Sequence, residues 1–179
     1  VNTAKAVSEI LLGMPINYYV VIDYEGIKNI VQAMGGVPIT IQKGGMYYKD
    51  PKDKPPLVIA IPEGEQVLDG EHAVQFLRFR QNSDGSGYRE GDIGRIKAHQ
   101  EFMKSAFRQC LSFKLPEIAK TVFENVESDI TLGKVTSLAT KAVGISADDI
   151  ETYLLPGTPQ SAAPWFVIPN AEKTAEMIN

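Results

Sequence analysis

Apolar residues recur at the spacing of an amphipathic helix in five parts of the chain. After Asp23, which can cap a helix, apolar side chains occupy positions i, i+3, i+4 and i+7, and Gly35 and Gly36 end the pattern. This predicts a helix with one buried face. That stripe consists of Ile27, Ile30, Val31 and Met34, and the others consist of Ala6, Val7, Ile10 and Leu11; Ile93, Ile96, Met103, Phe107 and Cys110; Ile118, Ala119, Val122 and Phe123; and Leu132, Val135, Leu138, Ala139 and Ala142.

Glycine, proline and asparagine mark the ends of these helices. Gly13 and Pro15 follow the first stripe, Pro116 stands in the first turn of a later helix, and Gly144 follows the last stripe. Asn170 can cap a terminal helix. These positions agree with the preference of proline for helix starts and glycine for helix ends.

Runs of β-forming residues predict strands at 18–22, 37–41, 57–61, 150–155 and 165–168. The first run is apolar throughout, which indicates a buried central strand with Tyr18 and Tyr19 in the core or at its edge. Strand, helix and strand over 18–41 form a βαβ-like unit, so an α/β class with helices on the faces of a sheet is predicted. Segment 44–56 is rich in Gly, Pro and charge and reads as a surface loop, packed on its own domain or touching a membrane or glycan.

Composition narrows the class of protein. The 179 residues suit one domain over 1–179, with 44% hydrophobic and 22% charged residues. A net charge of −4 argues against broad nucleic-acid binding through a basic face. The single Cys110 lies on an apolar stripe and reads as a packed thiol. No apolar run approaches the ~20 residues of a membrane span, no signal peptide opens the chain, and no metal-ligand spacing is present.

The stretch 73–100 carries the candidate chemistry, because it gathers four arginines around a Gly-rich acidic loop. A short helix opened by Asp69 delivers Arg78. If the following run is extended, the apolar Leu77 and Phe79 turn one way while Arg78 and Arg80 turn the other. Two guanidiniums would then face one space.

The loop and the next helix add to this arrangement. Gly85, Gly87 and Gly91 permit positive φ angles and close approach of a ligand, and they leave backbone N–H groups unencumbered. At the start of the next helix, Arg95 and His99 share one face. Convergent arginines beside a helix N-terminus suit phosphate or pyrophosphate.

A plainer interpretation is also open on the residues alone. Asp84, Glu90 and Asp92 lie in the same stretch, so the arginines would only pair with carboxylates in a solvated network. Arg89, next to Glu90, fits this interpretation best. His72 faces outward on the short helix and reads as a solvated or capping histidine.

Two motifs of this stretch resemble a known family. PEGEQVLDGEHAVQFLRFR, followed by GDIGRIKAHQ, is similar to the signature of the LytR-CpsA-Psr (LCP) cell-envelope proteins. The resemblance extends to INYYVVIDYEGIKNIVQAMGGVPI upstream and to YLLPG and WFVIP downstream. It implies an αβα sandwich with a central mixed sheet flanked by helices. It also implies transfer of a phosphate-linked glycan (teichoic acid, capsule or other wall polymer) from a polyprenyl pyrophosphate carrier to peptidoglycan or another glycan acceptor, usually with Mg²⁺.

The resemblance also assigns roles to individual residues. Arg78, Arg80 and Arg95 would bind the pyrophosphate and stabilise its developing charge. Asp92 of GDIGR would orient Arg95 or accept the proton of the acceptor hydroxyl, and a carboxylate among arginines favours orientation. His99 stands where the family often has glutamine and would make a similar substrate contact. The implied catalytic set is therefore Arg78, Arg80, Asp92 and Arg95.

The family normally carries further elements before this point, namely an aspartate-bearing strand, an Arg-Asp strand and metal-binding residues. The chain is therefore expected to be truncated at its N-terminus, with its Mg²⁺ ligands upstream. The expected location is extracytoplasmic, at the cell envelope, with a membrane anchor in a missing segment. Two alternatives remain, a non-catalytic polyprenyl-phosphate binding module and a transcriptional attenuator, and the acidic balance counts against the second.

Overall fold

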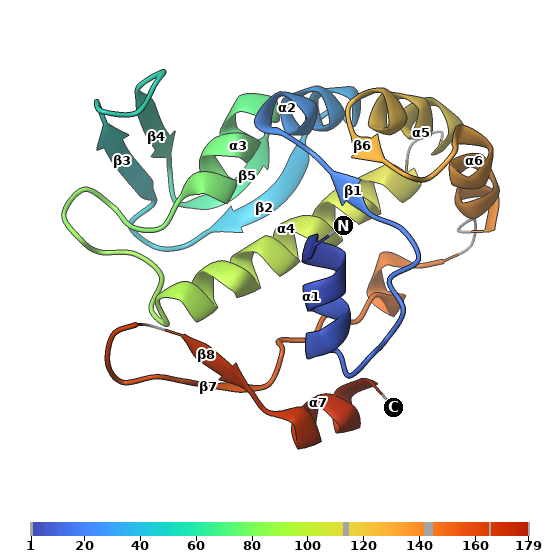
Figure 1. The fold of residues 1–179 in the computed structure, drawn as a ribbon. Helices are drawn as coiled ribbons and strands as arrows, with labels where there is room; N and C mark the ends of the chain where they lie inside the picture. Colours follow the sequence, from blue (N-terminus) through green and yellow to red (C-terminus); the bar gives the residue numbers. More distant parts are fainter. Residues whose placement is uncertain (1, 113–114, 142–144, 165, 179) are drawn as a thin grey trace. The chain divides into compact units, whose positions relative to one another are not determined.

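The computed structural model describes residues 2–112, 115–141, 145–164 and 166–178, which form two compact units (Figure 1). Unit 1 comprises Val1–Val20, Ser128–Ile130 and Glu151–Asn179, and unit 2 comprises Val21–Glu127 and Thr131–Ile150. The elements in chain order are α1 (Asn2–Ile10), β1 (Val20–Val21), α2 (Tyr24–Ala33), β2 (Val37–Ile41), β3 (Met46–Asp50), β4 (Leu57–Ile61), β5 (Gly64–Leu68), α3 (Gly70–Arg78), α4 (Asp92–Ser112), α5 (Leu115–Glu124), β6 (Glu127–Ser128), α6 (Leu132–Lys141), the 3₁₀ turn η1 (Ala147–Asp149), β7 (Gly157–Pro159), β8 (Val167–Pro169) and α7 (Ala171–Ile178).

Unit 2 contains the hydrophobic core. Helix α2 begins as predicted, because the Asp23 side chain accepts a hydrogen bond from the Gly26 N–H at 2.7 Å. Helix α2 packs on α3, and α4 runs along β2 (Figure 1). A Cβ at Gly70 would lie 2.4 Å from the Lys28 carbonyl oxygen, so α2 and α3 approach closely only because this residue is glycine. The buried cluster consists of Val31, Met34, Val37, Ile41, Met46, Ile59, Ile61, Leu68, Ala73, Phe76, Phe79, Phe102 and Ile118.

The strands pair two by two. β2 and β5 are antiparallel from Val37↔Leu68 to Ile41↔Gly64, and β3 and β4 are antiparallel from Met46↔Ile61 to Asp50↔Leu57. Among the described residues, the other sheets are β1–β6 and β7–β8. The α/β class is confirmed, but these strands do not join in one central mixed sheet. The βαβ-like unit is not formed, because β1 and β2 belong to different sheets.

Several predicted strand boundaries are corrected. The expected loop 44–56 contains β3, whose Met46 is only 1% exposed because it packs in the core. Of the expected central strand 18–22, only Val20 and Val21 are β-structure, and both are 55% exposed. Tyr18 and Tyr19 are also exposed rather than buried. The run 150–155 forms no strand, β7 lies beyond it, and Trp165 lies outside the described residues.

The predicted stripe of α4 is corrected at Met103 and Phe107, whereas Cys110 packs against the core as predicted. Met103 is 63% exposed, whereas its neighbour Phe102 is 4% exposed and stacks on Phe76 with ring centroids 5.7 Å apart. The residues that face the core follow a spacing of four, and they are Ala98, Phe102, Ala106 and Cys110. Burial raises the pKa of the Cys110 thiol, in agreement with a packed residue. In α6, the predicted Ala142 and Gly144 lie outside the described residues.

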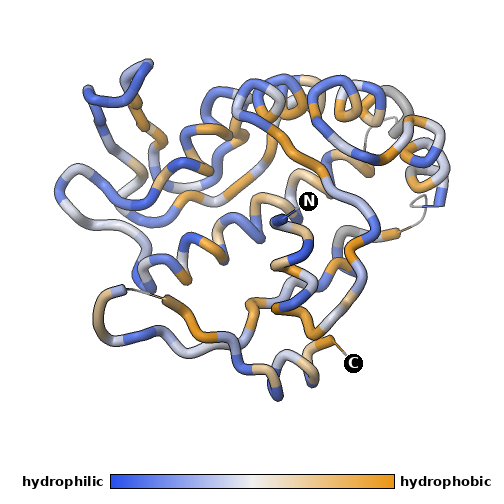
Figure 2. The backbone as a smooth tube through the Cα atoms, viewed as in Figure 1, coloured by the Kyte–Doolittle hydropathy of each residue, from blue (hydrophilic) through white to orange (hydrophobic). Residues whose placement is uncertain are grey.

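Unit 1 has almost no buried side chains. Helix α1 has none, and Thr174 in α7 is the only buried residue in the described part of the unit. Asn170 caps α7 as predicted, accepting the Lys173 N–H at 3.0 Å. Hydrophobic stretches of the unit, such as the one at β8, are visible in Figure 2. No helix in the described part of the chain has the length and apolarity needed to cross a membrane.

Candidate functional site

Helix α3 positions the first arginine. The Asp69 side chain accepts the His72 N–H at 2.9 Å and caps the helix. The helix continues to Arg78, and the chain becomes extended only at Phe79, so the predicted extended run of 77–80 is corrected at its first two residues. Phe79 is fully buried and packs edge-on against Tyr88. A buried anchor thus separates Arg78 from Arg80.

The loop that follows is a tight turn rather than an open cradle. Gly85 and Gly91 have the positive φ angles that the sequence predicts, 85° and 58°. Gly87 instead allows two backbone segments to lie close together, because a Cβ there would lie 3.0 Å from the Arg80 carbonyl oxygen. The backbone N–H groups are not unencumbered: Asn82 donates to Ser86 at 2.6 Å, and Gly85 donates to Asn82 at 3.0 Å. The hydrogen-bonded amides of this turn are therefore not a row of free N–H groups for a ligand.

The three arginines that the sequence singles out line one cavity of about 690 Å³ in unit 2. Arg78 reaches it from α3, Arg80 from the extended segment, and Arg95 from the first turn of α4. The remaining lining residues are Tyr24, Tyr48, Asp50, Asp53, Leu57, Leu77 and Gln81. Tyr24, Asp50 and Asp53 were not foreseen, because they lie in segments that meet the arginines only through the fold.

Each arginine has a different environment. Arg78 forms an ion pair with Asp53, and its guanidinium lies 5.0 Å from the centroid of the Tyr24 ring, which is a cation–π distance. Arg95 pairs with Asp92 at 2.8 Å across one helical turn. Among the described residues, the exposed Arg80 guanidinium has no ion-pair or hydrogen-bond partner. The hydrogen bond from Arg78 lowers the pKa of the Asp53 carboxyl, which therefore stays ionised at neutral pH.

The plainer network of charges is only partly formed. Glu90 pairs with Lys97 rather than with Arg89. Arg89 is exposed and does not line the cavity, which agrees with its expected place outside the anion site. The Asp84 side chain accepts the Ser86 N–H at 2.9 Å and closes the turn instead of meeting an arginine. The Asp92–Arg95 pair is the contact that an orienting role for Asp92 requires. That role stays a prediction.

His99 lies at the edge of this region and not among the lining residues. Its Nε2 lies 3.1 Å from the Leu77 carbonyl oxygen, at the end of α3. Burial lowers the pKa of His99, so the neutral ring can donate its Nε2–H to this carbonyl. The observed contact ties α4 to α3. The substrate contact that the resemblance implies for His99 has no support from this position.

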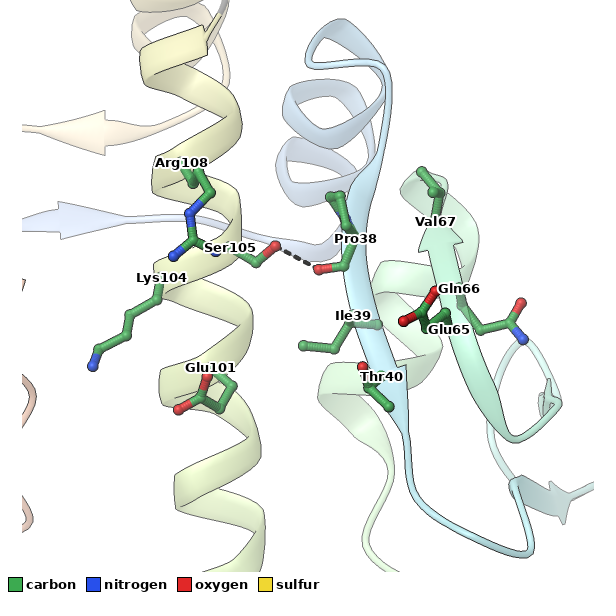
Figure 3. Close-up of a pocket in the computed structure, with 10 residues that line it drawn as sticks. All are labelled: Pro38, Ile39, Thr40, Glu65, Gln66, Val67, Glu101, Lys104, Ser105 and Arg108. Carbon is green, nitrogen blue, oxygen red and sulfur yellow. Dashed lines mark hydrogen bonds between the residues drawn. The ribbon is translucent and has the colours of Figure 1, made fainter. Parts of the chain in front are cut away.

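A second cavity of about 580 Å³ lies between α4 and the β2–β5 pair (Figure 3). Its lining mixes Glu65 and Glu101 with Lys104 and Arg108. Figure 3 shows Lys104 extending away from β2, and Arg108 pairs with Asp148 at 2.8 Å. The basic groups therefore do not converge there, and this cavity suits a phosphate less well than the cavity lined by Arg78, Arg80 and Arg95.

Mg²⁺ does not fit the residues present. Within the described ranges, no group of three or more His, Cys, Asp or Glu side chains is placed to hold a metal ion. Mg²⁺ is often held by one or two carboxylates with substrate phosphates. Asp53, however, is paired with Arg78, and Asp50 accepts the Lys52 N–H at 2.9 Å. Ligation of Mg²⁺ by residues outside the described ranges stays a prediction.

The fold resembles solved structures across nearly the whole chain. The crystal structure of Bacillus subtilis TagV matches with a TM-score of 0.75 and 23% identity, covering 97% of this chain and 65% of that one. A structure of TagT bound to LI-WTA matches with a TM-score of 0.71 and 21% identity, covering 98% of this chain and 62% of that one. At these identities, the matches establish the fold.

Sequence comparison finds relatives of the same kind. The polyisoprenyl-teichoic acid–peptidoglycan teichoic acid transferase TagU of Bacillus cereus (strain AH820) is 26% identical over 185 residues, covering 97% of this chain and 54% of that protein. TagV of Bacillus subtilis (strain 168), which bears the same transferase name, is 25% identical over 154 residues, covering 84% of this chain and 38% of that protein. The chain thus spans about half of these relatives or less. The LytR_cpsA_psr family profile matches residues 2–179, and the chain therefore belongs to the LytR_cpsA_psr family.

Proposed function

We propose that this chain supplies the pyrophosphate-binding part of an envelope glycopolymer transferase. The observation that carries the proposal is the convergence of Arg78, Arg80 and Arg95 on one cavity. Three guanidinium cations on one cavity suit a ligand with two linked phosphates. The names of the relatives indicate the substrates, a polyisoprenyl-linked teichoic acid or similar glycan as donor and peptidoglycan as acceptor. The reaction would take place outside the cytoplasmic membrane, with the protein anchored by a segment outside this sequence.

The proposed reaction exchanges the phosphoanhydride bond of the carrier pyrophosphate for a phosphoester bond to the acceptor. A hydroxyl oxygen of the acceptor attacks the glycan-linked phosphorus, the bond to the bridging oxygen breaks, and polyprenyl phosphate leaves while the hydroxyl loses its proton. Such transfers are catalysed mainly by positioning and by stabilising negative charge. Arg80, which has no partner among the described residues, is available for the phosphates at once. Asp92 would hold Arg95 toward them, because the two side chains already pair.

A non-catalytic binding module is the second candidate, and one observation favours it. Asp53 and Asp92, the carboxylates nearest the arginines, are both engaged in ion pairs with them. The hydrogen bond from Arg78 lowers the pKa of the Asp53 carboxyl, which makes Asp53 a weak base. The described residues therefore offer charge stabilisation more readily than proton removal. Incubation with a polyprenyl-pyrophosphate-linked glycan and peptidoglycan separates the candidates, because only the transferase releases polyprenyl phosphate.

A binding titration tests the site itself. Arg80→Ala should weaken binding of farnesyl pyrophosphate about 10- to 100-fold, as expected for the loss of one charged hydrogen bond. Arg89→Ala is the matched control, because Arg89 is also an exposed arginine, lies in the loop that follows Arg80 and does not line the cavity. The control should change affinity by less than about twofold at moderate salt. An equal loss in both variants would show general charge attraction and contradict the site. A DNA duplex should bind neither the wild type nor the two variants.

A further inference from the structure

The turn that joins β3 to β4 supplies one wall of the arginine cavity. Asp50 and Asp53, at the end of β3 and in the turn, both line it. The base of the hairpin is fixed to the Gly-rich loop, since Tyr47 N–H donates to Asn82 Oδ1 at 2.6 Å and Ser83 N–H donates to the Tyr47 carbonyl at 3.0 Å. The hairpin and the arginine loop are therefore held together at one end.

The turn itself, residues 51–56, is held much less. Its backbone bonds are local, from Lys52 N–H to Asp50 and from Lys54 N–H to Asp53. Among the described residues, the ion pair of Asp53 with Arg78 is the one side-chain bond that ties this turn to the rest of unit 2. Because the base of the hairpin is fixed and its turn is held by one ion pair, loss of that pair frees the turn alone. We call residues 51–56 the strap.

The Asp53 carboxylate accepts a hydrogen bond from Arg78 Nη2, a donor that also suits a phosphate oxygen. The Arg78 guanidinium is held from another side by the Tyr24 ring, so it need not move when the carboxylate leaves. A phosphate that binds the same Nη2 group of Arg78 displaces Asp53, and it gains Arg80 and Arg95 in the same cavity, which a single carboxylate cannot use at once.

We propose that Asp53 is an internal competitor for the anion site and that the turn 51–56 is a strap that opens when linked phosphates bind. The proposal rests on the proposed function, because it assigns a regulatory contact to that same cavity. The ion pair lowers the apparent affinity by the fraction of molecules in which Arg78 is occupied. Both partners are partly exposed to solvent, so the effect is of the size measured for exposed ion pairs.

Calorimetric titration with inorganic pyrophosphate tests the competition. Asp53→Asn should bind about two- to fivefold more tightly than wild type, which corresponds to the upper range for an exposed ion pair. Asp50→Asn is the matched control, because it removes the same charge from the same cavity and leaves the Asp53–Arg78 pair intact. Equal tightening in both variants would show a general field effect and overturn the proposal. Unchanged or weaker binding by Asp53→Asn would overturn it as well.

Hydrogen exchange measured by mass spectrometry tests the strap. Pyrophosphate should speed the exchange of the peptide that contains residues 51–56 in wild type, although a ligand ordinarily slows exchange near its site. In Asp53→Asn, this peptide should exchange quickly with or without pyrophosphate. Slower exchange on binding in wild type would overturn the strap while leaving the arginine site intact. Absence of pyrophosphate binding in both proteins would refute the arginine site and the strap together.

Discussion

The two compact units treat their apolar residues in opposite ways. Unit 2 buries thirteen of them in one cluster, whereas the described part of unit 1 buries none. Unit 1 is nevertheless rich in such residues: Phe166, Val167 and Ile168 are all more than half exposed. The free energy of folding that comes from apolar burial therefore resides in unit 2, which also holds the arginine cavity. A run of apolar residues therefore marks buried core in unit 2 but exposed surface in the described part of unit 1.

Two Phe→Ala substitutions, one in each unit, test this difference in burial and have the largest expected effect on the free energy of unfolding. Phe79→Ala should lower the free energy of unfolding by about 3–5 kcal/mol, because the ring is fully buried and packs on Tyr88. Phe166→Ala in unit 1 should change it by less than about 0.5 kcal/mol, because that ring is 61% exposed. Urea denaturation followed by circular dichroism measures both. Similar losses in the two variants would mean that unit 1 is as tightly packed as unit 2.

Close packing within unit 2 gives the next largest effect. Gly70→Ala should cost roughly 1–3 kcal/mol, because its Cβ would meet the Lys28 backbone and push α3 away from α2. Gly133→Ala in α6 is the control, since no atom lies within 4 Å of a Cβ there. That control should stabilise the protein by up to about 1 kcal/mol. Because α3 carries Arg78, Gly70→Ala should also weaken pyrophosphate binding, and unchanged binding would show that the α2–α3 contact does not position the arginine.

The sequence predicts the helices and strands of unit 2 better than it predicts the contacts between segments that lie far apart in the chain. The stripe of α2 is confirmed because its N-cap at Asp23 and its spacing of three and four are local signals. Arg78, Arg80 and Arg95 belong to a short stretch of chain and line one cavity, although the segment before Phe79 is helical. Their binding role stays a prediction. In both cases, residues close in sequence decide the outcome.

The errors concern contacts between distant segments. Asp53 meets Arg78 across 25 residues, and nothing in its own turn indicates this. The run 18–22 was predicted to be buried because it is apolar, but burial also requires a covering surface, and Val20 and Val21 remain exposed. The hairpin at 46–61 left a detectable signal, since Met46, Ile59 and Ile61 are inward positions of two alternating strands. Its density of glycine, proline and charge obscured that alternation.

Substitutions that remove a helix cap test the same comparison between the two units, with a smaller expected loss in the free energy of unfolding. Asp69→Ala removes the cap of α3 and should lower the free energy of unfolding by about 1 kcal/mol. Asn170→Ala removes the corresponding cap of α7, and it should have a smaller effect on the same global transition because unit 1 adds no buried cluster. The hydrogen bond from the His72 N–H lowers the pKa of Asp69. The stabilisation from this cap is therefore present above the unfolded pKa and is lost as pH falls through the folded pKa.

The smallest effect concerns His99 and the joint between α3 and α4. Burial lowers the pKa of His99 in the folded protein, so the unfolded chain binds a proton more readily than the folded chain. The stability of the wild type should therefore fall as pH drops below about 6.5, the ordinary histidine value, toward the folded-state pKa. His99→Gln carries no titrating group there, so the stability difference between variant and wild type should shift in favour of the variant over that window. Urea midpoints at pH 5.0 to 7.5 measure the shift, and parallel curves would contradict a partly buried, neutral imidazole. Pyrophosphate affinity of the variant should stay within about twofold of wild type at pH 7.5, because His99 bonds the Leu77 carbonyl and does not line the cavity. A larger change would return His99 to the ligand-binding set that the family resemblance implies.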